Sequence, residues 1–249
     1  HINNLYCFRD LSTMTLLYPI IEGANLNADL EYSEDYYNEL SINNSIVNNG
    51  DNYDFGIVTV NDTFKVSFSN DGNIYEYDLL FTTLPTIMFY VDDDIQNEPK
   101  VSSSIYINDP FLLTSFNSFA GIEIRGATST NYPKKSYDIE LWSDKSGDNK
   151  INKALFNMRN DDDWILDAMY IDFSKSRNII GMEIWEDFSV ADYLNDEVDA
   201  RLSQSGVFVE IFINDNYRGI YSLNEQIDRK QLQISLDEGI LYKSNDYTL

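Results

Sequence analysis

Gly121-Ile-Glu-Ile-Arg-Gly-Ala-Thr-Ser-Thr-Asn-Tyr-Pro-Lys-Lys-Ser-Tyr-Asp-Ile-Glu-Leu141 has the pattern of a strand, a polar loop and a second strand. Apolar and polar residues alternate on both sides of the loop, which is the period of half-buried strands. The loop contains Gly126, several hydroxyls and the pair Lys134-Lys135. It is either the polar turn of a β-hairpin or a phosphate site, since a glycine, exposed amides, hydroxyls and a lysine could hold a phosphate. The residues alone favour the hairpin turn.

The size and charge of the chain restrict its class. Its 249 residues suit one large or two small domains, and 43% hydrophobic with 14% aromatic residues indicate a globular protein. The net charge of −25 repels the phosphates of nucleic acids and of anionic membranes, so we exclude both as general partners. This acidity fits a secreted or cell-surface protein, where it could hold calcium, or it is simply a solvated surface.

Cysteine and histidine are almost absent. Cys7 alone can form neither an internal disulfide nor a thiolate metal cluster, and His1 alone cannot supply a catalytic triad or the usual zinc site. Any catalysis would therefore rest on carboxylates, lysines or arginines. The sequence contains no run of 18 apolar residues, so no membrane-spanning helix is predicted. Because the first residue is His1, we expect a processed chain or a fragment of a longer one.

Residues 1–83 predict a small antiparallel β-sandwich that resembles the immunoglobulin-like modules of bacterial surface proteins. Short β-type runs alternate there with Asn-, Asp- and Gly-rich turns, and the turn at 70–73 joins two strands as a hairpin. No catalytic constellation is visible in this region, so we expect a spacer. Leu84-Pro85 marks the predicted boundary with a second domain, residues 84–249.

The second region predicts mainly strands and one long helix. Strands are expected at 86–91, 101–107, 164–170, 206–213, 217–223 and 239–243, with a short helix ending near residue 232. The long helix is predicted to begin near Asp172 or Ser174, with Ile180, Ile184 and Phe188 on one stripe. Arg177 in its first turn opposes the helix dipole, so it indicates either an anionic partner or an ordinary surface arginine.

Four blocks together resemble the CotH family, named for a bacterial spore-coat protein kinase. They are Ile124–Tyr137, Asp163–Asn178, Gly219–Asp228 and Gly239–Lys243. The resemblance implies the N-terminal lobe of an atypical, ATP-dependent protein Ser/Thr kinase, with ATP and Mg²⁺ or Mn²⁺ as cofactors and a protein partner or substrate. It also implies a secreted or surface protein of bacterial origin. The expected fold class is mainly β with a few helices (α+β), namely a small β-sandwich followed by a kinase-like antiparallel β-rich lobe.

Side-chain parity suggests which lysine would grip the nucleotide. On a strand, Lys135 shares a face with Tyr137, and Glu225 continues the face of Tyr221. We therefore predict a Lys135–Glu225 pair that mimics the lysine–glutamate pair of kinases, with a purely structural ion pair as the alternative. The predicted nucleotide-binding residues are Arg125, Ser129, Lys135, Arg177 and Glu225.

The resemblance also implies what this sequence lacks. In CotH proteins the aspartates that hold magnesium and orient the acceptor follow the Leu-Tyr-Lys strand, and no matching motif occurs up to Leu249. The expectation is an inactive fragment of a longer protein, with no catalytic residue of its own. The alternative is a non-catalytic adhesion or assembly module that binds protein or carbohydrate.

Overall fold

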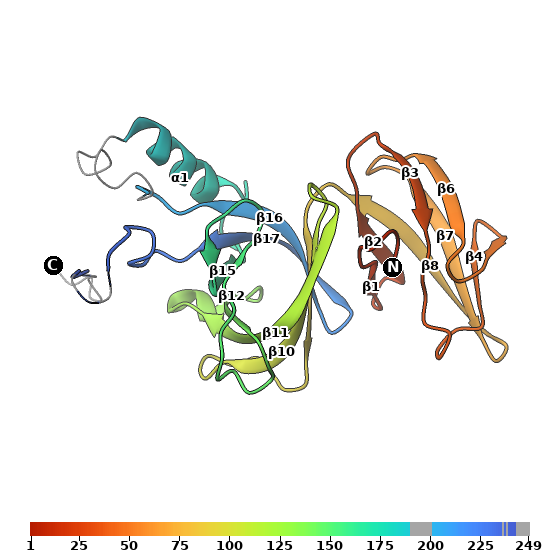
Figure 1. The fold of residues 1–249 in the computed structure, drawn as a ribbon, viewed down its shortest axis with the longest axis horizontal. Coiled ribbons are helices and arrows are strands. Elements are labelled where there is room, and N and C mark those ends of the chain that lie inside the picture. Colours follow the sequence, from red (N-terminus) through yellow and green to blue (C-terminus); the bar gives the residue numbers. More distant parts are fainter. Residues whose placement is uncertain (190–200, 236, 238, 243–249) are drawn as a thin grey trace.

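The computed structural model describes residues 1–189, 201–235, 237 and 239–242. Two β assemblies lie next to each other: an N-terminal module and a barrel, with one helix in the connection between two of the barrel strands (Figure 1). The predicted fold class, mainly β with few helices, is confirmed. No helix within these ranges combines the length and the apolar character needed to cross a membrane.

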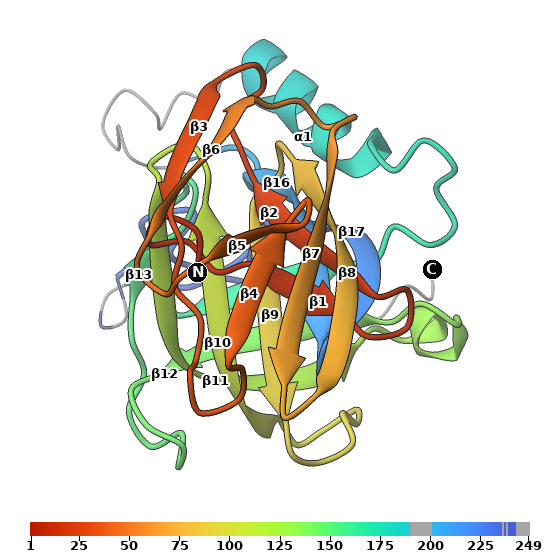
Figure 2. The ribbon, with the colours of Figure 1, turned by 90° about the vertical axis from the view of Figure 1, so that its right-hand side faces the viewer.

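The N-terminal module is built from two sheets of unequal size. The larger sheet has six strands in the order β1-β2-β8-β7-β4-β5, whereas the smaller consists of β3 and β6 only. Figure 2 looks onto this module, with the barrel behind it. The larger sheet comprises β1 (Phe8–Asp10), β2 (Thr15–Pro19), β4 (Glu39–Ile42), β5 (Ser45–Val47), β7 (Thr63–Asn70) and β8 (Asn73–Thr82), and the smaller β3 (Asn25–Asp29) and β6 (Asn52–Ile57).

Aromatic rings and a glycine turn explain why this part of the sequence forms a sandwich. Phe55 of β6 lies edge-on against Phe64 and Phe81 of the larger sheet, with ring centroids 5.0 and 6.3 Å away, so the two sheets share one core. The hairpin predicted at 70–73 is confirmed. Asp71 and Gly72 both have positive φ angles, 48° and 84°, as a tight two-residue turn requires.

The second assembly is a closed seven-stranded barrel in the order β10-β11-β12-β15-β17-β16-β9. Its neighbours pair antiparallel except β16 and β9, which are parallel and close the ring. Its core includes Trp164, Ile122 and Leu141, none of which is exposed. The strands are β9 (Thr86–Val91), β10 (Val101–Asp109), β11 (Thr114–Arg125), β12 (Ser136–Trp142), β15 (Asp163–Asp167), β16 (Gly206–Ile213) and β17 (Asn216–Glu225), with β13 (Lys153–Ala154) and β14 (Asn160–Asp161) as a separate ribbon.

The strand–loop–strand prediction for residues 121–141 is confirmed. β11 and β12 pair antiparallel up to Arg125 opposite Ser136, and residues 126–135 form the loop, which contains the short 3₁₀ helix η1 (Thr128–Asn131). The sequence predicted an antiparallel lobe but not a closed one. Closure depends on the pairing of β16 with β9, two strands separated by more than a hundred residues, and local patterns carry no information about such a contact.

Helix α1 (Arg177–Phe188) begins later than predicted. Asp172 and Ser174 belong to the preceding turn, where one carboxylate oxygen of Asp172 accepts the Ser174 amide at 3.0 Å. The other oxygen accepts the amide of Arg177 at 2.9 Å. Asp172 lies outside the helix, five residues before Arg177, and its side chain satisfies the otherwise unpaired amide of that residue. Arg177 lies in the first turn of the helix, as predicted.

The apolar stripe of α1 faces solvent. Ile180, Ile184 and Phe188 are 47%, 51% and 82% exposed, and only Ile179 of this helix is buried. The period of the stripe was correct, but the described part of the chain does not cover it.

Two further expectations are wrong. Residues 228–233 form a bend and turns where a short helix ending near residue 232 was predicted, and residues 239–242 are not part of a strand. Lys243, the last residue of that predicted strand, lies outside the described residues.

The module and the barrel are joined through buried contacts. Phe8 of β1 packs with Met88 and Phe212 of the barrel, and all three side chains are at most 5% exposed. Asn108, fully buried on β10, bonds both backbone groups of Tyr6. Its Oδ1 accepts the Tyr6 amide at 2.9 Å, and its Nδ2 donates to the Tyr6 carbonyl at 2.8 Å. Such paired amide bonds fix register as well as position.

Asp215, in the turn between β16 and β17, extends this junction. Its carboxylate accepts hydrogen bonds from Arg9 and from the Tyr90 hydroxyl, each at 2.7 Å. Its carbonyl accepts the Leu11 amide at 2.9 Å. Hydrogen bonding to this carboxylate, after burial, raises the pKa of Tyr90 well above its usual range.

Candidate functional site

The loop from Gly126 to Lys135 is held in one compact conformation. Gly126 has a φ of +121°, and a Cβ built there would lie 1.9 Å from Ser129 Oγ, so no other residue fits without rearrangement. The Thr130 hydroxyl donates to the Ala127 carbonyl at 2.6 Å, which closes the η1 turn. The predicted Ser129 is therefore packed against the glycine within this loop.

Lys135 completes the loop from inside. Its Nζ donates to the Thr130 carbonyl at 2.6 Å. Because Lys135 lies before the first residue of β12, the alternation of that strand does not determine where its side chain goes. Its observed contact is with its own loop.

Lys134 reaches across the end of the barrel to β17. Its Nζ donates to the Ile220 carbonyl and lies 4.0 Å from the centroid of the Tyr221 ring. Burial, followed by the nearby charge of Lys175, lowers the pKa of Lys134 to about 8, although Asp167 and Glu210 act in the opposite direction. The ammonium thus contacts a carbonyl and an aromatic face in a partly desolvated environment. A bound anion would stabilise the charged form of this lysine.

The predicted Lys135–Glu225 pair is not formed. Tyr137 pairs with Leu166 and Leu166 with Leu223, so Lys135 lies level with Tyr221. Glu225 is four residues further along β17, about 13 Å at the rise of a strand. Parity correctly placed Glu225 on a buried face, where it is 1% exposed, but parity says nothing about height along the barrel.

Glu225 has other partners instead. Its carboxylate accepts the backbone amides of Arg159 at 2.8 Å and Ser205 at 3.1 Å, and Arg201 NH1 lies 3.9 Å away. These contacts tie the end of β17 to the segments before β15 and β16. Glu225 therefore supports the barrel at a level away from the two lysines.

Arg125 belongs to an ion network that joins β11 and β12 to the residue before β10. Its NH1 lies 2.7 Å from Asp138, which also contacts Lys100 Nζ at 3.0 Å. Gln226 donates to the same carboxylate at 3.2 Å, and Lys100 reaches Glu123 at 3.1 Å. The guanidinium of Arg125 is thus already paired.

Asp167 joins the loop end of the barrel to helix α1. Its carboxylate accepts the Asn178 side-chain amide at 3.0 Å and the Met169 amide at 2.9 Å, with the Ser136 hydroxyl at 3.4 Å. Predicted Arg177 points its guanidinium toward Asp172, with Nε at 3.5 Å, and is 76% exposed at its side chain. Sequence reasoning did not select Asp167, because a lone carboxylate at the end of a strand has no distinguishing pattern.

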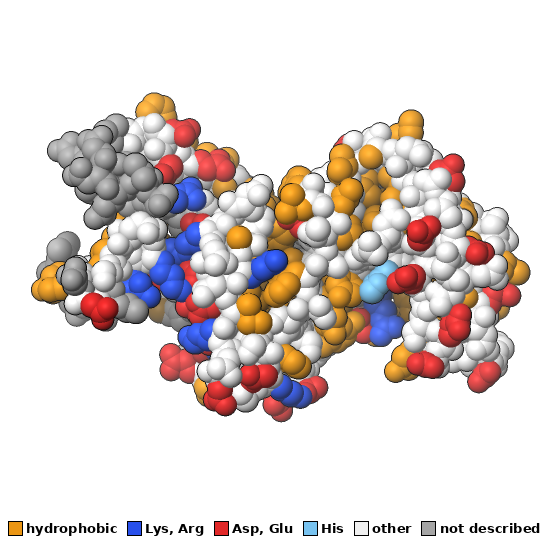
Figure 3. All heavy atoms as spheres, in the orientation of Figure 1, with side chains coloured by type: hydrophobic (Ala, Val, Ile, Leu, Met, Phe, Trp, Pro, Cys, Tyr) orange, Lys and Arg blue, Asp and Glu red, His pale blue; other side chains and the backbone are white. Residues whose placement is uncertain are grey.

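Further side chains complete this barrel end. The rings of Tyr132 and Tyr170 stack with centroids 5.3 Å apart, and Lys175 Nζ donates to the Met169 carbonyl at 2.7 Å. Figure 3 shows that Lys and Arg side chains gather over the barrel half of the molecule. The structure thus brings together Ser129, Lys135 and Arg177 of the prediction near one end and adds Lys134, Lys175, Asp167 and Tyr221, which sequence reasoning missed.

A group of carboxylates lies on β12 and at the start of β15, with one residue just before that strand. Single oxygens of Glu140, Asp162 and Asp163 lie within 4.8 Å of one another. Burial, then the charges of Asp162 and Glu140, raises the pKa of Asp163 to about 6. Lys150 contacts Glu140, and Lys230 lies 2.8 Å from Asp162, so ammonium groups already balance this charge.

Comparison with known proteins places the chain in a family. The family model described as CotH kinase protein matches residues 122–248, which include all four sequence blocks and the barrel end just described. A search of curated proteins finds no match. With half of its length matched, the chain belongs to the CotH kinase protein family.

Proposed function

We propose that the barrel is the nucleotide-binding lobe of an ATP-dependent protein Ser/Thr kinase-like protein. Lys134 carries this proposal. It is a half-buried ammonium with a lowered pKa, held over Tyr221 between the loop Gly126–Lys135 and the strand β17. Membership of the CotH kinase family supports ATP as the ligand. Kinases of other folds also hold nucleotide phosphates between a loop and a lysine, although there the loop is glycine-rich and the lysine lies on a strand.

In this proposal each group has a separate task. Lys134 neutralises phosphate charge, Lys135 and Gly126 keep the loop folded, and Lys175 adds a second positive charge nearby. Asp167 and the amide oxygen of Asn178 are hard oxygen donors that suit Mg²⁺ or Mn²⁺. The ion, when bound with ATP, would neutralise phosphate charge. We assign no catalytic carboxylate among the described residues.

Calorimetric titration of the full chain with ATP and Mg²⁺ tests the proposal. Lys134→Met should weaken binding by about ten- to a hundredfold, since a charge-assisted contact of about 1.5–3 kcal/mol is lost. Lys145→Met, at an exposed lysine whose ammonium pairs with Asp92, is the matched control and should leave ATP affinity unchanged. Equal ATP affinity in wild type and Lys134→Met would refute the assignment. Absence of ATP binding would favour the alternative, a non-catalytic module that binds protein or carbohydrate.

The lowered pKa adds a second readout. Above about pH 8 the free protein loses the Lys134 proton, so ATP affinity should fall as pH rises from 7 to 9. Lys134→Arg keeps its charge throughout this range and should remove the decline. An identical decline in wild type and Lys134→Arg would show that another group titrates.

A further inference from the structure

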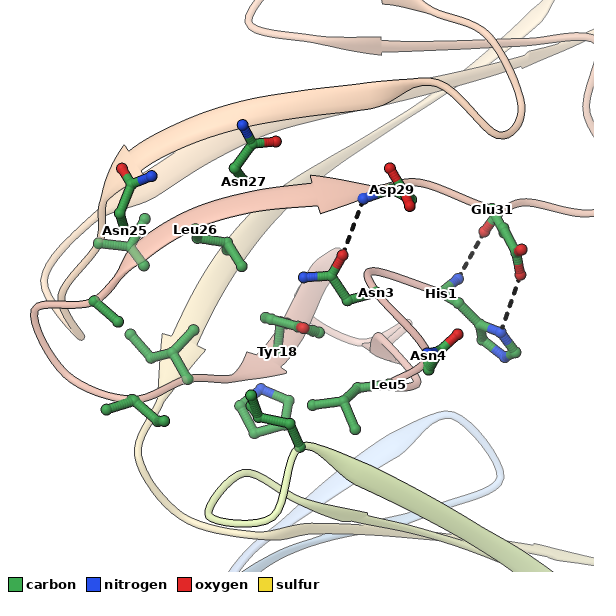
Figure 4. Close-up of a pocket in the computed structure, with 16 residues that line it drawn as sticks. His1, Asn3, Asn4, Leu5, Tyr18, Asn25, Leu26, Asn27, Asp29 and Glu31 are labelled. Carbon is green, nitrogen blue, oxygen red and sulfur yellow. Dashed lines mark hydrogen bonds and ion pairs between the residues drawn. The ribbon is translucent and has the colours of Figure 1, made fainter.

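The smaller sheet of the N-terminal module ends at an unpaired edge beside a pocket. β3 pairs with β6 on one side only. Next to its other side is a cavity of about 440 Å³, shown in Figure 4. The cavity has an apolar floor, and the β10–β11 turn of the barrel contributes one side of it. The residues of the floor and this side are Leu5, Ile20, Leu26, Val58 and Leu113.

Backbone groups of β3 face this cavity. The Ala24 carbonyl accepts the Val58 amide on the β6 side, and Asp29 bonds Asn3 on the opposite side. Since the bonding direction alternates along a strand, the N–H and C=O groups of Asn25 and Asn27 also point to the side of Asp29. Within the described ranges these four groups have no hydrogen-bond partner there.

The N-terminal segment of the chain begins a third strand at this edge and then leaves it. Ile2 forms a bridge with Leu30, and Asn3 exchanges two bonds with Asp29, at 2.9 and 3.0 Å. Asn3 and Asn4 then adopt positive φ angles of 50° and 35°, and the chain turns away. Figure 4 shows Asn3 below the Asp29 end of β3, with Leu26 directed toward the cavity. The position of a third strand beside residues 25–27 is thus defined by an existing pairing but is not taken by this segment.

Charge restricts what could take that position. Asp29 and Glu31 are among the lining residues, and no Lys or Arg is. His1 also lines the cavity and contacts Glu31, with its Nδ1 3.6 Å from the carboxylate, so Asp29 is the carboxylate left open to a partner's cation. Arg9 and Lys65 are the two basic residues among the first 83, against thirteen acidic ones. A second copy of a chain with a net charge of −25 would be repelled from this rim. A basic partner would be attracted to it.

We propose that the free edge of β3 binds an extended, basic peptide segment of a partner protein. The segment adds as a strand and bonds the backbone of Asn25 and Asn27, as in other cases of strand addition to a sheet edge. One apolar side chain enters the cavity over Leu26, and a flanking Lys or Arg lies near Asp29. This site is separate from the proposed nucleotide end of the barrel.

The test uses the full chain and the peptide acetyl-Lys-Thr-Val-Thr-Val-Thr-Lys-amide. Its binding is followed by amide hydrogen exchange and by NMR shifts of Asn25 and Asn27. We expect slower exchange at both amides. A peptide N-methylated at its valines, which cannot donate those hydrogen bonds, should bind about tenfold more weakly.

Two variants and one control separate edge and cavity. Asn27→Pro removes one free-edge N–H but leaves the β6 side paired, a placement that sheets tolerate, and should weaken binding about tenfold. Leu113→Asn removes an apolar side of the cavity at a residue whose φ is +52°, which asparagine tolerates, and should weaken binding about threefold or more. Leu112→Asn, at an exposed neighbour that does not line the cavity, should leave binding unchanged.

Three results would overturn the proposal. One is unchanged exchange at Asn25 and Asn27 with about 1 mM peptide, where even weak binding is visible. Another is equal binding by wild type and a folded Asn27→Pro variant. The third is a dimer of the chain in sedimentation that Asn27→Pro abolishes, because a second copy would then occupy the edge. Equal affinity for a probe with glutamates in place of its lysines would overturn the basic character of the partner.

Discussion

The barrel and the N-terminal module use strands in opposite ways. In the barrel every strand has two neighbours, so backbone groups are satisfied within the ring and side chains at its ends remain for binding. In the module the sheets are unequal, and β3 keeps one edge unpaired beside a cavity. In the closed barrel, binding can therefore use only side chains such as Lys134. At the open edge of β3, the backbone itself is available for binding.

Charge follows the same division. The first 83 residues carry two basic side chains, and the other fifteen belong to the rest of the chain. At the loop end of the barrel the charge of Lys175, after burial, lowers the pKa of Lys134. One chain of net charge −25 thus combines a local cationic end with an acidic edge, although its overall charge repels anions.

Truncating a side chain in the core of the barrel should lower the free energy of unfolding the most. Trp164 has no exposed surface, and Trp164→Ala should lower the free energy of unfolding by about 3–5 kcal/mol in a denaturant titration. Trp185→Ala, at a tryptophan that is 58% exposed on α1, should change it by less than about 0.5 kcal/mol. Similar losses in both variants would contradict the placement of Trp164.

A substitution that distorts the loop between β11 and β12 should lower the free energy of unfolding by a smaller amount. Gly126→Ala forces a Cβ against Ser129 and a strained φ, so it should cost about 1–3 kcal/mol of unfolding free energy and also weaken ATP binding. Gly181→Ala within α1, where nothing lies within 4 Å, should instead stabilise by about 0.5–1 kcal/mol. A neutral Gly126→Ala would show that the loop is not fixed as described.

The carboxylates on the barrel predict a pH effect. The pKa of Asp163 is raised to about 6, so the folded state keeps a proton that the unfolded state releases near pH 4. Its stabilising contribution is complete below about pH 4 and is lost as pH rises toward 6. Asp163→Asn should therefore match wild type near pH 4 but exceed its stability at pH 7 by up to about 2 kcal/mol in thermal unfolding.

Exposed Asp35 of the N-terminal module offers the control for this charge effect. Asp35→Asn should leave the stability difference between pH 4 and 7 within about 0.5 kcal/mol of wild type. A flat pH profile for the difference between wild type and Asp163→Asn would contradict the raised pKa.

Exposed ion pairs should matter least in both regions. Lys145–Asp92 belongs to barrel loops, and Lys65–Asp78 joins β7 to β8 in the module. Lys145→Ala and Lys65→Ala should each leave the midpoint of a denaturant titration unchanged, because solvent screens exposed ion pairs. A clearly lower midpoint in either variant would identify a network that the contacts do not reveal.

Local sequence patterns predicted most strands, but not the register in which neighbouring strands pair. The alternation at Ile122 and Ile139 predicted β11 and β12, and parity placed Glu225 on a buried face. The Lys135–Glu225 pair failed because it depends on the registers of β12, β15 and β17. A period of two gives the face of a residue and leaves its level undetermined.

The same reason explains the rest of the candidate site. Lys134 was set aside by parity, yet it contacts Tyr221, because the residues before β12 do not follow the alternation of the strand. The charges of Asp167 and Lys175 act on Lys134 only because the barrel fold brings these segments together. The stripe at Ile180 and Ile184 predicted a helix correctly but not what covers that helix.

The hairpin of β16 and β17 has a mechanical consequence. Its turn is held by the N-terminal module through Asp215, which Arg9 and the Leu11 amide contact. Further along β17, Ile220 and Tyr221 hold the Lys134 ammonium. The hairpin, which carries one register shift at Ile211 and Phe212, therefore links contacts of the N-terminal module to the partners of Lys134 at the proposed ATP site. Displacing the module relative to the barrel should also displace those partners.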